Sequence, residues 1–134
     1  MTVLALDTSV AVPALLSGHP EHERCRERIV TTRVSLSGHS YLETYSVLTR
    51  LPLPDRLTPA EAEALLSRAF DKPLELGVAL ADAIRTLAAA GISGGATYDG
   101  LVALAARTHG ARLLTRDVRA RPVYDVLGVD YEVV

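Results

Sequence analysis

Short apolar runs alternate with longer stretches of helical periodicity along this chain. The first run, residues 3–6, is apolar throughout, which is typical of a strand buried on both faces of a sheet. It ends at Asp7, and Thr8 and Ser9 then favour the start of a helix that continues through Leu16. Three further strands are predicted, at 34–37, 111–115 and 129–134.

Stretches with helical spacing of apolar residues lie between these strands. The ranges that we expect to be helical are 21–30, 40–50, 59–70, 80–90, 97–109 and 123–127. The stretch 74–76 is too short to assign as a strand. Because helices separate the strands and no hairpin signal such as Asn-Gly occurs, the pattern predicts an α/β fold with a parallel sheet wrapped by helices.

The composition agrees with one globular domain over residues 1–134. Hydrophobic residues make up 49% of the chain and charged residues 22%, a balance found in folded rather than disordered proteins. The net charge of −2 gives no overall basic field that would indicate nucleic-acid binding. Cys25 is the only cysteine, which excludes an internal disulfide and a cysteine-rich zinc site. With no signal peptide or membrane-length apolar run in the sequence, we expect a cytoplasmic protein with no membrane partner.

Four acidic residues stand where this fold would bring them to one edge of the sheet. Asp7 and Asp117 directly follow apolar strands, whose carboxyl ends share an edge in a parallel sheet. Glu43 lies in the first turn of the helix after the second strand, and Asp99 in the first turn of the helix that Thr97 is expected to cap. Helices that leave the sheet at this edge also begin there, so we expect the four carboxylates to lie together.

Each acid also has a purely structural explanation. The pattern Ser40-x-x-Glu43 fits a capping box, in which Glu43 satisfies its own helix terminus. Asp99 is well placed to complement a helix dipole, and Asp7 and Asp117 to start turns. All four structural explanations together are harder to sustain, because four carboxylates gathered at one edge would repel one another. A bound cation would relieve that repulsion. Since all the ligands would be oxygens, the expected ion is Mg²⁺ or Mn²⁺, which activates water and neutralises a phosphoryl transition state.

The order of these acids resembles the acidic constellation of PIN-domain nucleases. Three short stretches resemble the motifs of that family: 6–9 (LDTS), 98–103 (YDGLVA) and 114–117 (LTRD). A chain of this length is similar to the VapC-type toxins of toxin–antitoxin pairs, and the resemblance runs from the first strand to the last. It implies a PIN-like fold with a central parallel sheet of four to five strands and helices on both sides. It also implies a Mg²⁺-dependent endoribonuclease that cleaves structured cellular RNA, a cognate antitoxin protein and usually a homodimer.

The resemblance also implies roles for individual residues. Asp7, Asp99 and Asp117 would hold the metal ion, and Glu43 would ligate it or position water. Four further residues are expected to support the site or contact RNA: Thr8, Ser9, Thr115 and Arg116. The guanidinium of Arg116, which stands where many relatives carry Asn, is expected beside the acids, where it would either bind an RNA phosphate or weaken metal binding.

The implied antitoxin would lay its C-terminal segment along the catalytic groove. An arginine in that segment suits the negative pocket, because a guanidinium can enter it in place of the metal ion. Apolar residues beside that arginine are expected to bury against exposed helix faces near Leu16 and Leu48.

Two alternatives stay open. One is a PIN-type nuclease for RNA maturation outside any toxin–antitoxin pair, and the other is a catalytically idle PIN-fold binding module, which the presence of all four acids disfavours. Two other classes fit poorly. A haloacid-dehalogenase-like phosphatase needs a second Asp at the position of Ser9, and a response-regulator receiver needs a lysine near its acids, whereas the only lysine, Lys72, precedes a proline.

Overall fold

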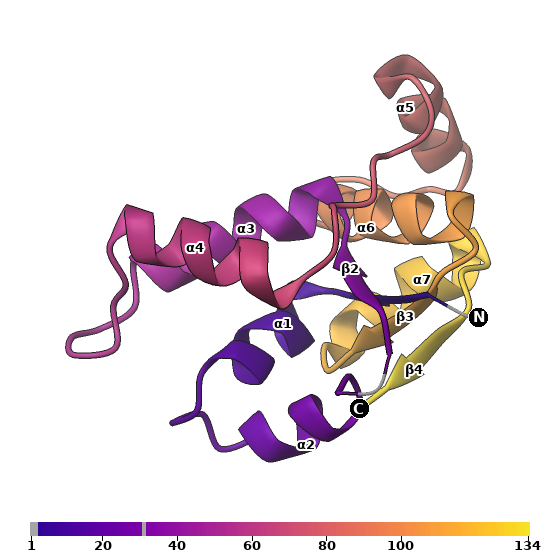
Figure 1. Cartoon of the computed structure of the whole chain (residues 1–134). Helices are drawn as coiled ribbons and strands as arrows, with labels where there is room; N and C mark the ends of the chain where they lie inside the picture. The colour runs from indigo at the N-terminus through magenta and orange to yellow at the C-terminus, as the bar shows by residue number, and fades with distance from the viewer. Residues whose placement is uncertain (1–2, 31) are drawn as a thin grey trace.

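Four parallel strands form the centre of the molecule in the computed structural model, which describes residues 3–30 and 32–134. The strands are β1 (Leu4–Leu6), β2 (Val34–Leu36), β3 (Arg112–Thr115) and β4 (Tyr131–Val133). Their order in the sheet is β2-β1-β3-β4 (Figure 1), and every neighbouring pair is parallel. The predicted parallel sheet is therefore confirmed, and the apolar first strand is a central one.

Helices occupy all the predicted stretches between the strands. They are α1 (Thr8–Leu15), α2 (His22–Glu27), α3 (Gly38–Thr49), α4 (Pro59–Ala69), α5 (Leu80–Ala89), α6 (Ala96–Thr108) and α7 (Arg121–Leu127). A short 3₁₀ helix, η1 (Val118–Ala120), leads from β3 into α7. The stretch at 74–76 forms no strand, and only Leu74 makes an isolated bridge with Ser37.

Side chains on the two faces of the sheet belong to two separate cores. Leu4 and Leu6 of β1 pack with buried residues of α1 to α4, whereas Ala5 packs with buried residues of α5, α6 and α7. On β3, Leu113 and Leu114 divide in the same way. Because successive strand residues point to opposite faces, this division places helices on both sides of the sheet, as the PIN resemblance implied.

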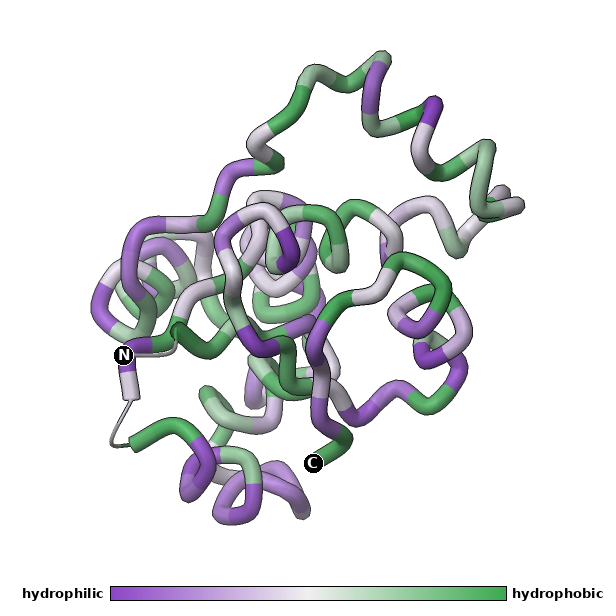
Figure 2. Tube along the Cα trace, turned by 90° about the vertical axis from the view of Figure 1, so that its right-hand side faces the viewer, coloured by the Kyte–Doolittle hydropathy of each residue, from purple (hydrophilic) through white to green (hydrophobic). Residues whose placement is uncertain are grey.

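Helix α5 departs from this layered arrangement. It projects from the body of the protein (Figure 1), and apolar positions recur along the projecting segment at the top of Figure 2. Leu80 and Ile84 on this helix are exposed, whereas Ala83 and Leu87 pack into the core. In the described part of the chain, no helix is both long and apolar enough to cross a membrane.

The residues that begin three helices differ from those that the sequence predicted. Asp7, not Thr8 or Ser9, is the N-cap of α1. Helix α3 starts two residues earlier than expected, because the hydroxyl of Ser37 accepts a hydrogen bond from the backbone N–H of Ser40 at 3.1 Å. For α6 the structure contradicts the expected Thr97 cap.

In α6 the N-cap is Gly95, which offers no side-chain cap, and Thr97 lies inside the helix. A Ser or Thr near the end of a helix is a frequent cap, but which one serves depends on where the chain turns into the helix. That turn is set by the packing of the preceding segment and is not visible in the local pattern.

Candidate acidic site

The four acids predicted from the sequence line one small pocket at the carboxyl edge of the sheet. Asp7 follows β1, Asp117 follows β3, Glu43 comes from α3 and Asp99 from α6. The pocket has a volume of about 60 Å³. The structure thus brings the four acids singled out from the sequence to one small pocket.

The strand ends determine where Asp7 lies. Leu6 pairs with Leu36 on one side and Leu114 on the other, and the backbone N–H of Asp7 donates to the carbonyl of Leu114 at 3.1 Å. The sheet thus ends at the same level on its two central strands. Asp7 is consequently held beside Thr115, and Thr115 precedes Asp117 by two residues in the chain.

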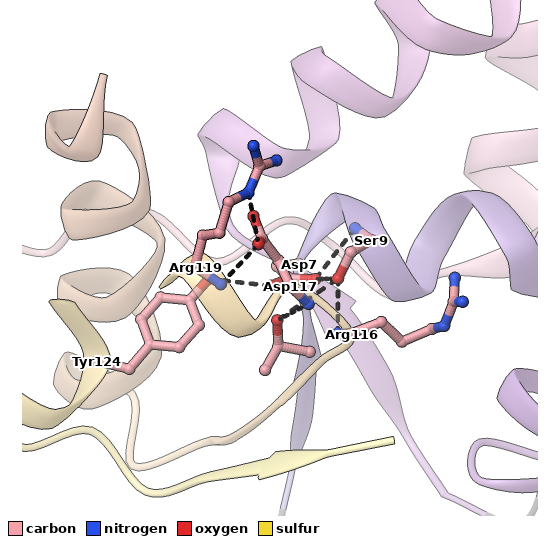
Figure 3. Close-up of polar contacts among 7 residues, drawn as sticks. Asp7, Ser9, Arg116, Asp117, Arg119 and Tyr124 are labelled. Carbon is pink, nitrogen blue, oxygen red and sulfur yellow. Dashed lines mark hydrogen bonds and ion pairs between the residues drawn. The ribbon is translucent and has the colours of Figure 1, made fainter. Parts of the chain in front are cut away.

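The carboxylate of Asp7 accepts hydrogen bonds on both oxygens (Figure 3). Oδ1 accepts from the backbone N–H of Ser9 at 3.0 Å and from the Ser9 hydroxyl, and Oδ2 accepts from the hydroxyl of Tyr124 at 2.9 Å. Asp7 is only 6% exposed. Burial raises the pKa of Asp7 above its usual value, and the hydrogen bonds from Ser9, Thr115 and Tyr124 oppose that rise.

Ser9 and Thr115 join the start of α1 to the segment after β3. The Thr115 hydroxyl accepts from the backbone N–H of Asp117 at 3.0 Å and lies 3.4 Å from the Ser9 hydroxyl. The Ser9 hydroxyl in turn accepts from the backbone N–H of Arg116 at 2.7 Å. These contacts fix the two segments that carry Asp7 and Asp117 relative to each other. Thr8 also lines the pocket.

Asp117 is the N-cap of η1 and is paired with Arg119. Its Oδ1 accepts from the backbone N–H of Arg119 at 3.0 Å, and the Arg119 guanidinium Nε lies 3.5 Å from the same oxygen. The Arg119 side chain is otherwise largely exposed. Asp117 therefore has the turn-forming role that the sequence allowed, in addition to its place in the pocket.

The carboxyl group of Asp99 lies among unfavourable charges. Burial raises its pKa to about 6, and the carboxylates of Asp117, Asp7 and Glu43 add to that rise, while His39 opposes it. A helix N-terminus favours the charged form of an acid and so lowers its pKa. Since the pKa of Asp99 moves the other way, its position in the first turn of α6 does not by itself explain its presence.

Glu43 is not part of a capping box, so this structural explanation was wrong. Because α3 begins at Gly38 and is capped by Ser37, Glu43 lies in the second turn and not at the helix terminus. The hydroxyl of Ser40 is buried without a hydrogen-bond partner among the described residues. The imidazole Nε2 of His39 lies 3.8 Å from Oε2 of Glu43, one helical turn along α3.

The guanidinium of Arg116 does not lie beside the acids, as had been expected. Figure 3 shows its side chain extending away from Asp7, and only its backbone N–H joins the network around the site. The side chain lines a neighbouring pocket of about 430 Å³ together with Arg119 and His19. This second pocket shares Thr8, Ser9 and Asp117 with the acidic pocket.

Three aromatic residues at the site were missed by sequence reasoning. Tyr124, which is fully buried, reaches Asp7 across 117 positions of the chain, and the sequence around it shows only an apolar helical pattern. His39 and Tyr98 line the acidic pocket with their rings stacked. The only signal for these two was their position next to the predicted acids, since Tyr98 precedes Asp99 and His39 lies one helical turn before Glu43.

The chemistry of this donor set fits a hard divalent cation. All the candidate ligand atoms are oxygens, and four carboxylates line the same pocket, where burial and the neighbouring carboxylates raise the pKa of Asp99. Within residues 3–30 and 32–134, however, no three His, Cys, Asp or Glu side chains lie close enough together to hold an ion as they stand. The oxygens of Asp7 and Asp117 also accept hydrogen bonds from the protein, and each carboxylate keeps lone pairs beyond those that these bonds use.

Comparisons with known proteins agree with this combination of fold and site. The PIN domain family model matches residues 4–126. Ribonuclease VapC27 from Mycobacterium tuberculosis is 47% identical over 127 residues, which cover 94% of this chain and 93% of the relative. Ribonuclease VapC40 from the same species is 41% identical over 134 residues, covering 98% and 99%. The chain therefore belongs to the PIN-domain family, in its VapC branch.

Solved structures of this branch share the fold. DNA-bound VapBC from Salmonella typhimurium superposes with a TM-score of 0.68 at 25% identity, covering 99% of this chain and 98% of the other. Mycobacterium tuberculosis VapC20, described as a toxin that cleaves the sarcin-ricin loop, superposes with a TM-score of 0.66 at 16% identity, covering 90% and 93%. The PIN fold predicted from the sequence is thereby confirmed.

Proposed function

We propose that residues 1–134 form one PIN domain that acts as a metal-dependent endoribonuclease and as the toxin of a toxin–antitoxin pair. The observation that carries the proposal is the convergence of Asp7, Glu43, Asp99 and Asp117 on one pocket. The 47% identity to a protein named as a VapC ribonuclease supports the same activity.

In this proposal Asp7, Asp99 and Asp117 hold Mg²⁺ or Mn²⁺, and Glu43 ligates the ion or orients the attacking water. The bound ion would supply activation of water and neutralise charge on the phosphodiester. Asp7 is positioned for this role by the donors of Ser9 and Tyr124. Glu43 is the most exposed of the four acids and has no capping role, which leaves its carboxylate free to accept a hydrogen bond from water.

Structured cellular RNA is the proposed substrate. The acidic pocket is small, and a strand whose bases are splayed away from a helix would give it the freest access to a phosphodiester. Loops of folded RNA present such strands, and proteins that recognise RNA sequence mostly read unpaired segments of this kind.

Arg116 and Arg119 are proposed to contact the RNA backbone beside the reacting phosphate. Their pocket adjoins the acidic pocket through Thr8, Ser9 and Asp117, so a strand that leaves the acids passes both guanidinium groups. Arginine suits this contact because its planar fork matches phosphate oxygens. Of the two outcomes expected for Arg116, the phosphate contact agrees better with a side chain that points away from the acids.

An antitoxin segment is the proposed regulatory partner. A pocket of about 360 Å³ lined by Leu15, Leu16 and Leu51 shares His19 with the arginine-lined pocket, and apolar residues of such a segment would pack there. The expected contact of the antitoxin segment near Leu16 is therefore kept in this proposal. Leu48 was wrongly expected on an exposed face, because it is fully buried in the core that α3 shares with α1, α2 and α4.

The expected homodimer also stays a proposal, and we place its contact on α5. Leu80 and Ile84 form an exposed apolar stripe on this projecting helix. Such a stripe is costly to leave in water, and a second copy of the chain would cover it. Size measurements on wild type and on Ile84→Glu test this contact directly.

The central experiment is incubation of purified protein with folded RNAs in Mg²⁺, in Mn²⁺ and in chelator. Cleavage that needs the ion and is lost in Asp7→Asn supports the nuclease. Induced expression should slow growth, and co-expression of the neighbouring gene should restore growth and yield a stable complex. If active wild-type enzyme leaves growth unchanged, the RNA-processing alternative replaces the toxin. Absence of cleavage under every condition would favour the idle binding module.

A further inference from the structure

Two aromatic rings are stacked at the rim of the acidic pocket. His39 from α3 and Tyr98 from α6 lie with ring centroids 4.9 Å apart and an interplanar angle of 13°. Both line the pocket, with Tyr98 next to Asp99 in the chain and His39 one turn before Glu43. The stacked pair therefore joins the two helices that carry the helix-borne acids.

Core packing does not explain the position of Tyr98. The residue is 55% exposed although one face of its ring is covered by His39. Much of the exposed area consequently belongs to the opposite face and the ring edge. A half-exposed tyrosine adds little to stability, but an open aromatic face supplies a large, rigid contact surface.

His39 holds this ring in a defined orientation. Its imidazole stacks on Tyr98 on one side, and its Nε2 lies 3.8 Å from Glu43 on the same helix. An aromatic ring that is already ordered loses less conformational freedom when a ligand stacks on it. The pair thus has the properties of a preformed stacking surface beside the acidic pocket.

We propose that the open face of Tyr98 binds an unpaired RNA base next to the phosphodiester in the acidic pocket, with His39 supporting the ring. The inference rests on the proposed ribonuclease function. In RNA each base is one sugar away from its phosphate, so a ring at the rim of the pocket is within reach of the neighbouring base. Stacking on aromatic side chains is how proteins commonly bind splayed bases, and it tolerates any base because each has a π face.

The pocket's own charge makes an uncharged contact useful. Four carboxylates repel an RNA strand until a cation is present, so binding energy from a stacked base does not depend on the same electrostatics. Contacts from Arg116 and Arg119 to phosphates weaken with salt, whereas stacking does not release counterions. The two kinds of contact are therefore separable by experiment.

Cleavage kinetics test the contact with paired changes in protein and RNA. Wild type, Tyr98→Ala and Tyr98→Phe are compared on an RNA with a normal nucleotide and on one with an abasic nucleotide beside the cleaved bond. On normal RNA, Tyr98→Ala should raise KM by roughly 5- to 150-fold, the range known for loss of one base–aromatic stack. Tyr98→Phe should stay close to wild type, and on abasic RNA the three proteins should have similar KM values.

Leu42→Ala is the matched control. Leu42 is also a large exposed side chain, 70% accessible, and it lies on α3 beside Glu43 without lining the acidic pocket. Its removal should leave KM unchanged on both RNAs. The KM effect of Tyr98→Ala should also persist at high salt, in contrast to that of Arg116→Ala.

A binding measurement decides the inference independently of cleavage. RNA carrying 2-aminopurine beside the cleavage position should lose fluorescence when it binds wild type, and less so with Tyr98→Ala. Equal quenching by both proteins, or an equal loss for Tyr98→Ala on normal and abasic RNA, overturns the base contact even if the ribonuclease is confirmed. The inference also fails if Tyr98→Ala weakens only the antitoxin complex. Lack of cleavage with base-specific quenching would instead reject the proposed activity and keep the base contact.

Discussion

The acidic pocket has two halves that are held in different ways. The strand-end half carries Asp7 and Asp117, which follow β1 and β3, and the helix half carries Glu43 on α3 and Asp99 on α6. In the strand-end half, Asp7 is almost fully buried, and both of its oxygens accept hydrogen bonds from Ser9 and Tyr124. In the helix half, Asp99 is half-buried and Glu43 is exposed. Burial raises the pKa of Asp99, and the neighbouring carboxylates add to that rise.

One pocket thus combines a firmly held part with a part that carries unrelieved charge. The strand-end half is set in place by the same hydrogen bonds that join β1, α1 and β3. The helix half keeps unrelieved repulsion, which a proton or a cation removes. The same substitution in the two halves should therefore change activity alike but change the stability of the metal-free protein differently.

The largest expected effect is on catalysis and does not distinguish the halves. Asp7→Asn and Asp99→Asn should each lower metal-dependent RNA cleavage by about 100-fold or more, because each removes a charged oxygen donor from the site. Asp71→Asn, which removes an exposed acid paired with Arg33, is the control and should remain active. Full activity in either pocket variant would remove that residue from the metal site.

Stability in chelator should separate the halves. Asp7→Ala removes the α1 cap and leaves the Tyr124 hydroxyl without its acceptor, so the free energy of unfolding should fall by about 1–3 kcal/mol. Asp99→Ala should leave it unchanged or raise it, because a repelled charge is lost. Denaturant titrations of both variants measure the contrast. Equal losses in both would mean that the helix half is held as firmly as the strand half.

The response to metal should depend on the helix half. In the proposed function, Mg²⁺ or Mn²⁺ would stabilise the native state by mass action, so a tenfold weaker site would lose about 1.4 kcal/mol of that gain. Glu43→Gln and Asp99→Asn should therefore show smaller increases in melting temperature on adding metal than wild type does. Melting temperatures lowered equally with metal and with chelator would indicate structural roles for these acids instead.

Tyr124→Phe tests the strand-end half by removing a single oxygen atom. Loss of the hydroxyl removes a donor to Asp7, so stability should fall by about 1 kcal/mol. Since that hydrogen bond lowers the pKa of Asp7, its loss should also move the acidic limb of the cleavage profile to higher pH. Tyr131→Phe provides a comparison, because its hydroxyl donates to Asp125, away from the pocket. An unchanged pH profile in Tyr124→Phe would show that this bond does not tune the site.

An effect is also expected on the pH dependence of the metal-free protein. The pKa of Asp99 is about 6 in the folded chain and 3.8 when unperturbed. The folded state therefore binds this proton more tightly, and the stability contributed by the group falls as the pH rises from about 4 to about 6. Asp99→Asn should lack this fall, and melts in chelator across that range measure the difference. A parallel pH dependence in both proteins would contradict the repulsion inferred for Asp99.

Much of the fold followed from local pattern. The apolar runs and helical spacings located the four strands and seven helices of the described part of the chain, because burial imposes a period on each element that the sequence records directly. The four acids were also found without the structure. Two of them follow buried strands, and parallel strands end at a common edge, so their meeting is a consequence of topology alone.

The details of capping and contact were decided by tertiary structure. Ser37 rather than Ser40 caps α3, and the guanidinium of Arg116 turns away from the acids although it stands between two site residues. Neither could be read from sequence, since Ser is a good cap at either position and a long side chain has many rotamers. Only the packing of the segments around β2 and β3 chooses among them.

What the sequence determined by itself is therefore the order of elements, the shared edge and the identity of the acids. What the tertiary structure decided is which distant groups meet there, such as Tyr124 with Asp7 and His39 with Tyr98. The physical reason is that periodicity and strand ends report burial, which is a local property of the chain. A hydrogen bond or ring stack between distant segments depends on how helices pack on the sheet, and local sequence carries no record of that packing.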